Sequence, residues 1–308
     1  MLASRWTAAA VRARPRLRRT PRPAAPHPVS ARRSFANNLG YDYSQNPVPV
    51  IRPLIWAATA VGTIYFTCAA FDVWQDIRTF REEDRRSLTF DELEAEHAKQ
   101  WRRKAVSQSI FTPGPIAAGS PRSVWDNLSG PSKIMAGMTL HTGTIHLAVN
   151  MLGLLNLGPP MAASPPISGS GSHFLAFYLS TGVLSSLGAQ AAALVFKQAR
   201  YSFGIGASGA VLGVFSAWAV GNPEARVRIF PFPWVFNAKS LVEWEVAFEA
   251  LGVLGVWTAL RLPIRFGHSV HLAGIGVGAA YVTYDKNAQL WATSRRAAFR
   301  SMKLVGLV

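Results

Sequence analysis

The sequence predicts an all-α membrane protein, a bundle of about six transmembrane helices. Charged residues make up only 16% of the 308 residues, whereas they form about a quarter of a typical soluble domain. Apolar segments of about twenty residues recur along the chain, and each is long enough to cross about 30 Å of hydrocarbon. The single cysteine, Cys68, excludes an internal disulfide framework. We therefore expect one helical core domain embedded in a lipid bilayer.

Residues 1–35 have the composition of a mitochondrial transit peptide. The first 33 residues contain nine arginines and no acidic residue, mixed with Ala, Ser and Pro. Arg33-Ser34-Phe35 resembles a cleavage context of the matrix peptidase, so we expect processing near residue 35. A nucleic-acid-binding arm would also be basic, but the Arg-only composition at the start of the chain favours a mitochondrial presequence. We therefore expect no nucleic-acid partner.

Residues 36–112 are expected to form an N-terminal transmembrane helix and a charged segment outside the membrane. The apolar span covers about 53–71, with Trp56 and Trp74 as interfacial aromatic residues. Residues 72–104 alternate acids and bases, a pattern typical of a solvated helix. We interpret this charged segment as a linker rather than as a docking surface.

Residues 113–285 are expected to form the core domain. After a loop rich in Pro, Gly and Ser, the hydrophobic pattern predicts five more spans. They cover about 134–157, 174–196, 201–220, 241–262 and 267–284.

Proline and glycine mark the ends of two of these spans. The 134–157 span should end at Gly158-Pro159-Pro160, before a flexible run at 162–172. The 201–220 span should stop at Gly221-Asn222-Pro223, because proline ends a helix. Residues 286–308 then form a basic C-terminal tail beside the membrane.

Ser208 is the candidate nucleophile of the chain. Serine is a poor nucleophile near neutral pH unless an adjacent imidazole takes its proton, and His271 in the last span is the candidate base. Because nothing acidic lies near His271 in the sequence, we expect a Ser–His dyad whose imidazole is oriented by packing and not by a carboxylate. The structural alternative is a serine that bonds to a carbonyl one turn earlier.

His146 and Asn150 are candidate oxyanion donors. They are four residues apart, so both side chains lie on one helix face and can donate to one point. The Ser208 backbone N–H is a third candidate if a helix begins there, because the first N–H groups of a helix lack internal partners.

Small residues are expected to hold the helices close together. Gly209 and Gly213 form a Gly-x-x-x-Gly face, and Gly274 and Gly278 form another. Such faces let two membrane helices approach closely, which would bring the candidate base to the candidate nucleophile. Gly206, which precedes the serine, is assigned to the same packing region.

The other histidines fit the role of structural residues better than the role of metal ligands. We interpret His141 as a hydrogen-bonded core residue. His268 and His271, with His141 and His146, could in principle bind a metal, but the chain has no His-Glu-x-x-His pattern and no clustered acid beside them. We therefore expect no metal and no cofactor.

Glu245 and Glu249 share one face of the 241–262 span. An intramembrane carboxylate is a sign of function, and a proton or ion transporter would use one. The pseudo-symmetric halves of many transporters are missing here. We expect these glutamates to lie in the headgroup region.

The motifs together resemble the rhomboid intramembrane serine proteases. His141, His146-x-x-x-Asn150, Gly206-Ala207-Ser208-Gly209 and His271-Leu272-Ala273-Gly274 occur in that family's order. The likeness covers about 125–302 and is to the mitochondrial inner-membrane branch, the presenilin-associated rhomboid-like type.

This resemblance implies a fold and a set of roles. The fold is a six-helix rhomboid core with one extra N-terminal helix. Ser208 would be the nucleophile, His271 the general base, and His146, Asn150 and the Ser208 amide the oxyanion site. The substrates would be transmembrane proteins, in this branch including a mitochondrial dynamin-like GTPase.

The number of spans leaves two interpretations open. The branch has seven spans, and we count six in this sequence. Either the helix at 53–71 takes the place of a core helix, or the chain is an incomplete version of the fold. A catalytically inactive rhomboid-like scaffold that binds transmembrane helices is therefore the alternative to a protease.

Overall fold

The computed structural model describes most of the chain after residue 47. The described residues are 48–83, 89–109, 144–167, 169–196, 199, 207–228, 234–262, 267–285 and 288–308. The chain divides into Met1–Gly40 and Tyr41–Val308, and every described residue belongs to the second unit. The predicted transit peptide, His141 and Gly206 lie outside the described residues.

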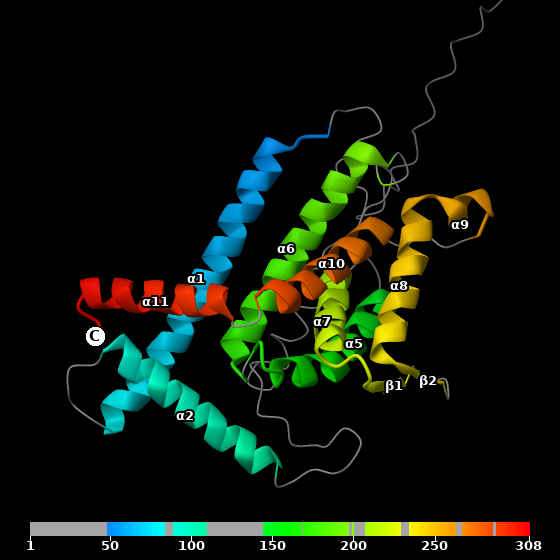
Figure 1. Cartoon of the computed structure of the whole chain (residues 1–308). Coiled ribbons are helices and arrows are strands. Elements are labelled where there is room, and N and C mark those ends of the chain that lie inside the picture. The colour runs from blue at the N-terminus through cyan, green and yellow to red at the C-terminus, as the bar shows by residue number, and fades with distance from the viewer. Residues whose placement is uncertain are drawn as a thin grey trace, which may run out of the picture. The chain divides into compact units, whose positions relative to one another are not determined.

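The described residues are mainly helical, which confirms the predicted all-α fold class (Figure 1). The helices are α1 (Ile51–Glu83), α2 (Phe90–Ser109), α5 (Thr144–Ala162), α6 (Gly171–Val195), α7 (Ala207–Gly221), α8 (Ala238–Val253), α9 (Val256–Ala259), α10 (His268–Tyr284) and α11 (Gln289–Leu304). Two short strands, β1 (Arg226–Arg228) and β2 (Val235–Asn237), form an antiparallel hairpin between α7 and α8.

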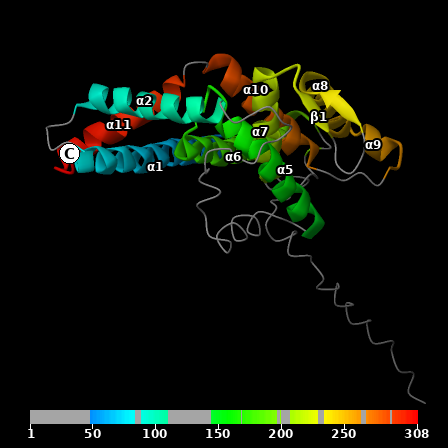
Figure 2. The ribbon, with the colours of Figure 1, turned by 90° about the horizontal axis from the view of Figure 1, so that it is seen from below.

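Both views place the elements of Tyr41–Val308 in the same order across the bundle. Helices α1, α2 and α11 lie at one end, and α8, α9 and the hairpin lie at the other (Figure 1, Figure 2). Helices α6, α7 and α10 lie between them. Among the described helices, α1 over Ile51–Phe80 and α6 are long and apolar enough to cross a membrane, and α7 is apolar but shorter.

Each predicted span overlaps a described helix, but several boundaries differ. Helix α1 continues past the predicted end at residue 71 to Glu83. The fifth span breaks after α8, because Gly255 takes a left-handed conformation with φ 80° before α9 begins. Helix α5 continues through Pro159 and Pro160 to Ala162, beyond the predicted end.

Hydrogen bonds connect the described residues of the run after α5, which the sequence predicts to be flexible. The Gly169 N–H donates to the Ala162 carbonyl at 2.9 Å. The Ser170 hydroxyl accepts a hydrogen bond from the His173 N–H at 3.0 Å and so caps the start of α6. Ile167 is fully buried between these turns. The polar composition of this run therefore reflects a compact turn with a helix cap.

Helix α7 is surrounded by other helices. It contacts α5, α6, α8 and α10, and most of its side chains are buried. The contact with α10 is backbone to backbone. A Cβ on Gly274 would overlap the Gly209 carbonyl, and a Cβ on Gly278 would overlap the Gly213 carbonyl. The small residues at these positions therefore set the distance between the two helices.

We expect Gly274→Ala to destabilise the protein by about 1–3 kcal/mol, the usual cost of overpacking, because the new methyl group would meet the Gly209 carbonyl. Gly276→Ala on the same helix is the matched control, since nothing lies within 4 Å of a Cβ there. Thermal unfolding in detergent should give a lower midpoint for Gly274→Ala alone. Equal midpoints for both variants would contradict the close crossing.

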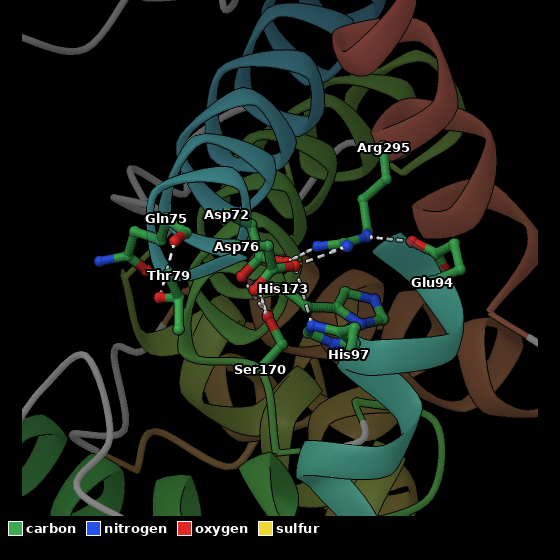
Figure 3. Close-up of polar contacts among 9 residues, drawn as sticks. All are labelled: Asp72, Gln75, Asp76, Thr79, Glu94, His97, Ser170, His173 and Arg295. Carbon is green, nitrogen blue, oxygen red and sulfur yellow. Dashed lines mark hydrogen bonds and ion pairs between the residues drawn. The ribbon is translucent and has the colours of Figure 1, made fainter. Parts of the chain in front are cut away.

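A charged cluster joins α11 to the N-terminal helices (Figure 3). Arg295 is 1% exposed, and its guanidinium donates to Asp72, to Asp76 at 2.8 Å and to Glu94 at 2.7 Å. Burial alone would lower the pKa of Arg295, but the carboxylates of Asp72, Glu94 and Asp76 raise it above its usual value. The guanidinium therefore stays charged and holds α1, α2 and α11 together.

Two more contacts extend this cluster. Asp72 accepts a hydrogen bond from the Ser170 hydroxyl at 3.1 Å, and Asp76 lies 3.0 Å from His97 Nδ1 (Figure 3). The interpretation of 72–104 as a solvated linker is therefore wrong for this part of α1 and α2. Within the basic C-terminal segment 286–308, folding buries Arg295 against carboxylates that are distant in sequence.

An aromatic contact ties the start of α6 to α10 and α11. The His173 ring stacks on Trp291 with centroids 4.5 Å apart, and its Nε2 lies 2.5 Å from the Tyr281 hydroxyl. These contacts hold the C-terminal half of α10 and the start of α11 against the start of α6.

We expect Arg295→Ala to destabilise the protein by about 3–5 kcal/mol, the usual cost of breaking a buried ion pair from one side. The variant would leave Asp72, which is 7% exposed, without its cation. Arg300→Ala, on the exposed side of the same helix, is the control and should be near neutral. Thermal unfolding of both variants measures the difference, and a wild-type midpoint for Arg295→Ala would refute the structural role of the cluster.

Candidate active site

Ser208 and His271 face each other where α7 and α10 begin. The Ser208 Oγ lies 2.8 Å from His271 Nε2, which is hydrogen-bonding distance. Ser208 is the second residue of α7, and His271 lies in the first turn of α10. The hydroxyl is mostly buried, since Ser208 is 9% exposed. The close crossing of the two helices thus brings together two side chains that are 63 positions apart in the sequence.

A third side chain, Glu249 of α8, binds the other nitrogen of His271. Glu249 Oε1 lies 2.7 Å from His271 Nδ1, and the glutamate is 1% exposed. The expectation that packing alone orients the imidazole is therefore wrong. Glu249 is buried where α8 packs against α10, and its expected position in the headgroup region stays a prediction.

The second oxygen of the same carboxylate binds His268. Glu249 Oε2 lies 2.5 Å from His268 Nδ1. The His268 ring covers Gly252, where any side chain would overlap it, and meets the Phe248 ring edge-on at 5.8 Å. His268 was a possible metal ligand from sequence, and the structure places its Nδ1 on a carboxylate.

These contacts define how protons are arranged when Glu249 is ionised. A carboxylate without a proton only accepts hydrogen bonds, so both Nδ1 atoms would donate to it. A neutral imidazole with its proton on Nδ1 has an acceptor at Nε2. In that tautomer, His271 Nε2 accepts the hydrogen bond of the Ser208 hydroxyl. The arrangement can therefore take a proton from the serine as the serine attacks an electrophile.

The predicted oxyanion residues lie on α5, which packs against α7. A Cβ on Gly153 would lie 2.9 Å from Val211 Cγ1, so the two helices are close there. Asn150 is buried, and its Nδ2 donates to the His146 carbonyl at 2.7 Å. The amide carries a second N–H for another acceptor. The role of His146 and Asn150 as oxyanion donors stays a prediction.

A different group has the spacing of metal ligands. In the part of the chain that the structure describes, one oxygen each from Asp72 and Asp76 and one nitrogen of His97 lie within 4.8 Å of one another. Arg295 pairs with both carboxylates and already supplies a positive charge there. The absence of a metal from the mechanism stays a prediction.

The sequence indicated Ser208 and His271 as candidates but did not predict the contact between Glu249 and His271. The available signal was its carboxylate inside an apolar span, which is costly in a membrane unless it is paired. Its partner could not be named, because 22 residues separate it from His271 and they lie on different helices.

Comparisons with known proteins agree with the motifs. A family model described as the rhomboid domain matches residues 129–287. The mitochondrial presenilin-associated rhomboid-like protein of Homo sapiens is 33% identical over 147 residues, which cover 47% of this chain and 35% of that protein. Its counterpart in Bos taurus is 32% identical over 147 residues, with the same coverage of both chains.

A fungal protein is also similar. The mitochondrial Rhomboid protein 1 of Saccharomyces cerevisiae is 26% identical over 163 residues, which cover 53% of this chain and 44% of that protein. The alignments thus span less than half the length of these relatives. No solved structure matches the chain. The resemblance that the sequence motifs predicted is confirmed by these matches.

Proposed function

Because the chain belongs to the rhomboid family, we propose that it is an intramembrane serine endopeptidase. It cleaves transmembrane segments of other membrane proteins, with Ser208 as nucleophile and His271 as general base. The observation that carries the proposal is the 2.8 Å contact between Ser208 Oγ and His271 Nε2. A serine beside an imidazole acceptor is the arrangement that activates a hydroxyl for attack on a carbonyl.

The proposed reaction proceeds in two halves. Ser208 Oγ attacks the carbonyl carbon of the scissile bond while His271 Nε2 takes the hydroxyl proton, and the carbonyl oxygen becomes an oxyanion. His271 then gives the proton to the leaving nitrogen, the C–N bond breaks, and an ester remains on Ser208. A water molecule, deprotonated by His271, hydrolyses this ester, releases the carboxylate product and restores the serine.

The oxyanion is assigned to donors on α5 and α7. His146, Asn150 and the Ser208 N–H are the proposed donors, and removal of one such donor typically costs about 2.7–4 kcal/mol of transition-state stabilisation. Support comes from the packing of α5 against α7 and from the position of Ser208 in the first turn of α7, where backbone N–H groups lack helical partners.

The proposed location is the mitochondrial inner membrane, with several spans. Support comes from the Arg-rich composition of residues 1–35 and from the names of the similar mitochondrial proteins. The substrates are proposed to be membrane proteins of the same bilayer, and a mitochondrial dynamin-like GTPase is one candidate.

We expect Ser208→Ala to reduce cleavage of a transmembrane substrate by about 10⁴-fold or more, as loss of the nucleophile does in soluble serine proteases. Purified protein in liposomes, mixed with a panel of single-span mitochondrial membrane proteins, provides the measurement. Ser186→Ala on α6 is the matched control, because that hydroxyl donates within its own helix, to the Gly182 carbonyl at 3.1 Å. The control should cleave like the wild type.

Two outcomes would contradict the proposal. One is retained cleavage in the Ser208→Ala variant with an unchanged unfolding midpoint. The other is a folded wild-type protein that binds transmembrane segments of the panel without cutting any of them, which would support the rhomboid-like scaffold instead.

A further inference from the structure

We propose that Glu249 is a positioning residue of a Ser–His–Glu arrangement and that His268 holds its carboxylate in place. This inference rests on the proposed protease function and deepens it. The four side chains come from three helices, with Ser208 on α7, Glu249 on α8 and both histidines on α10.

A continuous line of short contacts carries the proposal. Ser208 Oγ lies 2.8 Å from His271 Nε2, and His271 Nδ1 lies 2.7 Å from Glu249 Oε1. The other carboxylate oxygen, Oε2, lies 2.5 Å from His268 Nδ1. Each of the two oxygens thus has its own imidazole, and one of these imidazoles contacts the candidate nucleophile.

The Glu249 carboxylate selects one tautomer of His271, which packing alone does not do. A packed ring can carry its neutral-state proton on either nitrogen, whereas a carboxylate at Nδ1 holds the proton there and leaves Nε2 as the acceptor. When His271 takes the serine proton, it becomes an imidazolium, and the negative charge of Glu249 stabilises it. This stabilisation is stronger in a water-poor interior, where the effective dielectric constant is low.

His268 supplies the second support that a buried carboxylate needs. An ionised carboxylate out of water is costly unless both of its oxygens are hydrogen-bonded. The His268 ring has little freedom to leave, because it lies directly over Gly252 and meets the ring of Phe248. Glu249 is therefore held from one side and directs its other oxygen at His271.

The same helix offers a matched control. Glu243 lies on α8 as well, but its side chain is 63% exposed and lies 3.9 Å from Lys239 Nζ. Replacement of Glu243 removes a carboxylate from α8 without touching the histidines. A comparison of the two glutamates separates the role of the contact from the general effect of charge on this helix.

The test measures how fast a fluorophosphonate reacts with the full-length protein in liposomes, over a range of probe concentrations. We expect Glu249→Gln to lower the maximal labelling rate by about 100-fold or more with little change in half-saturation, since loss of the acid in soluble triads lowers kcat by about 10⁴-fold. Glu249→Asp keeps the carboxylate on a side chain that is one methylene shorter, so it should label at least about tenfold faster than Glu249→Gln but more slowly than the wild type. Glu243→Gln should label at the wild-type rate.

A second pair of variants tests the support from His268. His268→Gln can still donate an N–H to Glu249, whereas His268→Leu cannot. We expect the glutamine variant to label faster than the leucine variant. Equal labelling of both at the wild-type rate would overturn the role of His268.

Thermal unfolding of each variant shows whether slower labelling comes from a misplaced His271 or from loss of the fold. A wild-type labelling rate in folded Glu249→Gln would overturn the inference while leaving the proposed protease intact. If Glu249→Gln does not fold, Glu249→Asp decides: a wild-type midpoint with a reduced maximal rate supports the inference, and an unchanged rate overturns it. A folded wild-type protein that does not label would overturn both the inference and the proposed function.

Discussion

The rest of the structure depends on the backbone contact between α7 and α10. Gly274 meets the Gly209 carbonyl and Gly278 meets the Gly213 carbonyl, with no room for a side chain between them. The Ser216 hydroxyl adds a hydrogen bond to the Ile275 carbonyl at 2.8 Å. In lipid, helices gain little from hydrophobic association, so close packing of this kind provides much of the attraction. It also fixes where the first turns of both helices meet.

Polar side chains are gathered inside the apolar bundle where the first turns of α7 and α10 lie side by side. Ser208 and His271 lie in the first turns of α7 and α10, and Glu249 reaches them from α8. At the other end of the bundle, Arg295 is compensated by Asp72, Asp76 and Glu94 (Figure 3). Pairing stabilises both clusters, because Arg295 has three carboxylate partners and each oxygen of Glu249 has an imidazole partner. One cluster holds helices together, and the other contacts a candidate nucleophile.

The sequence predicted those features that depend on spacing along one helix. The Gly-x-x-x-Gly faces, the helical class and the Ser208 and His271 candidates follow from local patterns and from motif order. The partners of Glu249 and Arg295 could not be predicted, because they depend on how separate helices pack. A basic tail and an alternating acid–base run each suggest exposure by composition, and their mutual burial appears only when α1, α2 and α11 come together.

In the proposed protease, His271 activates Ser208 by accepting its proton. The most direct measurement is peptide mass spectrometry of the fluorophosphonate adduct, on wild type and His271→Ala in lipid. We expect one adduct, located on Ser208 in the wild type and absent from folded His271→Ala. An adduct on a different residue, or equal modification of Ser208 without the imidazole, would contradict this proposal.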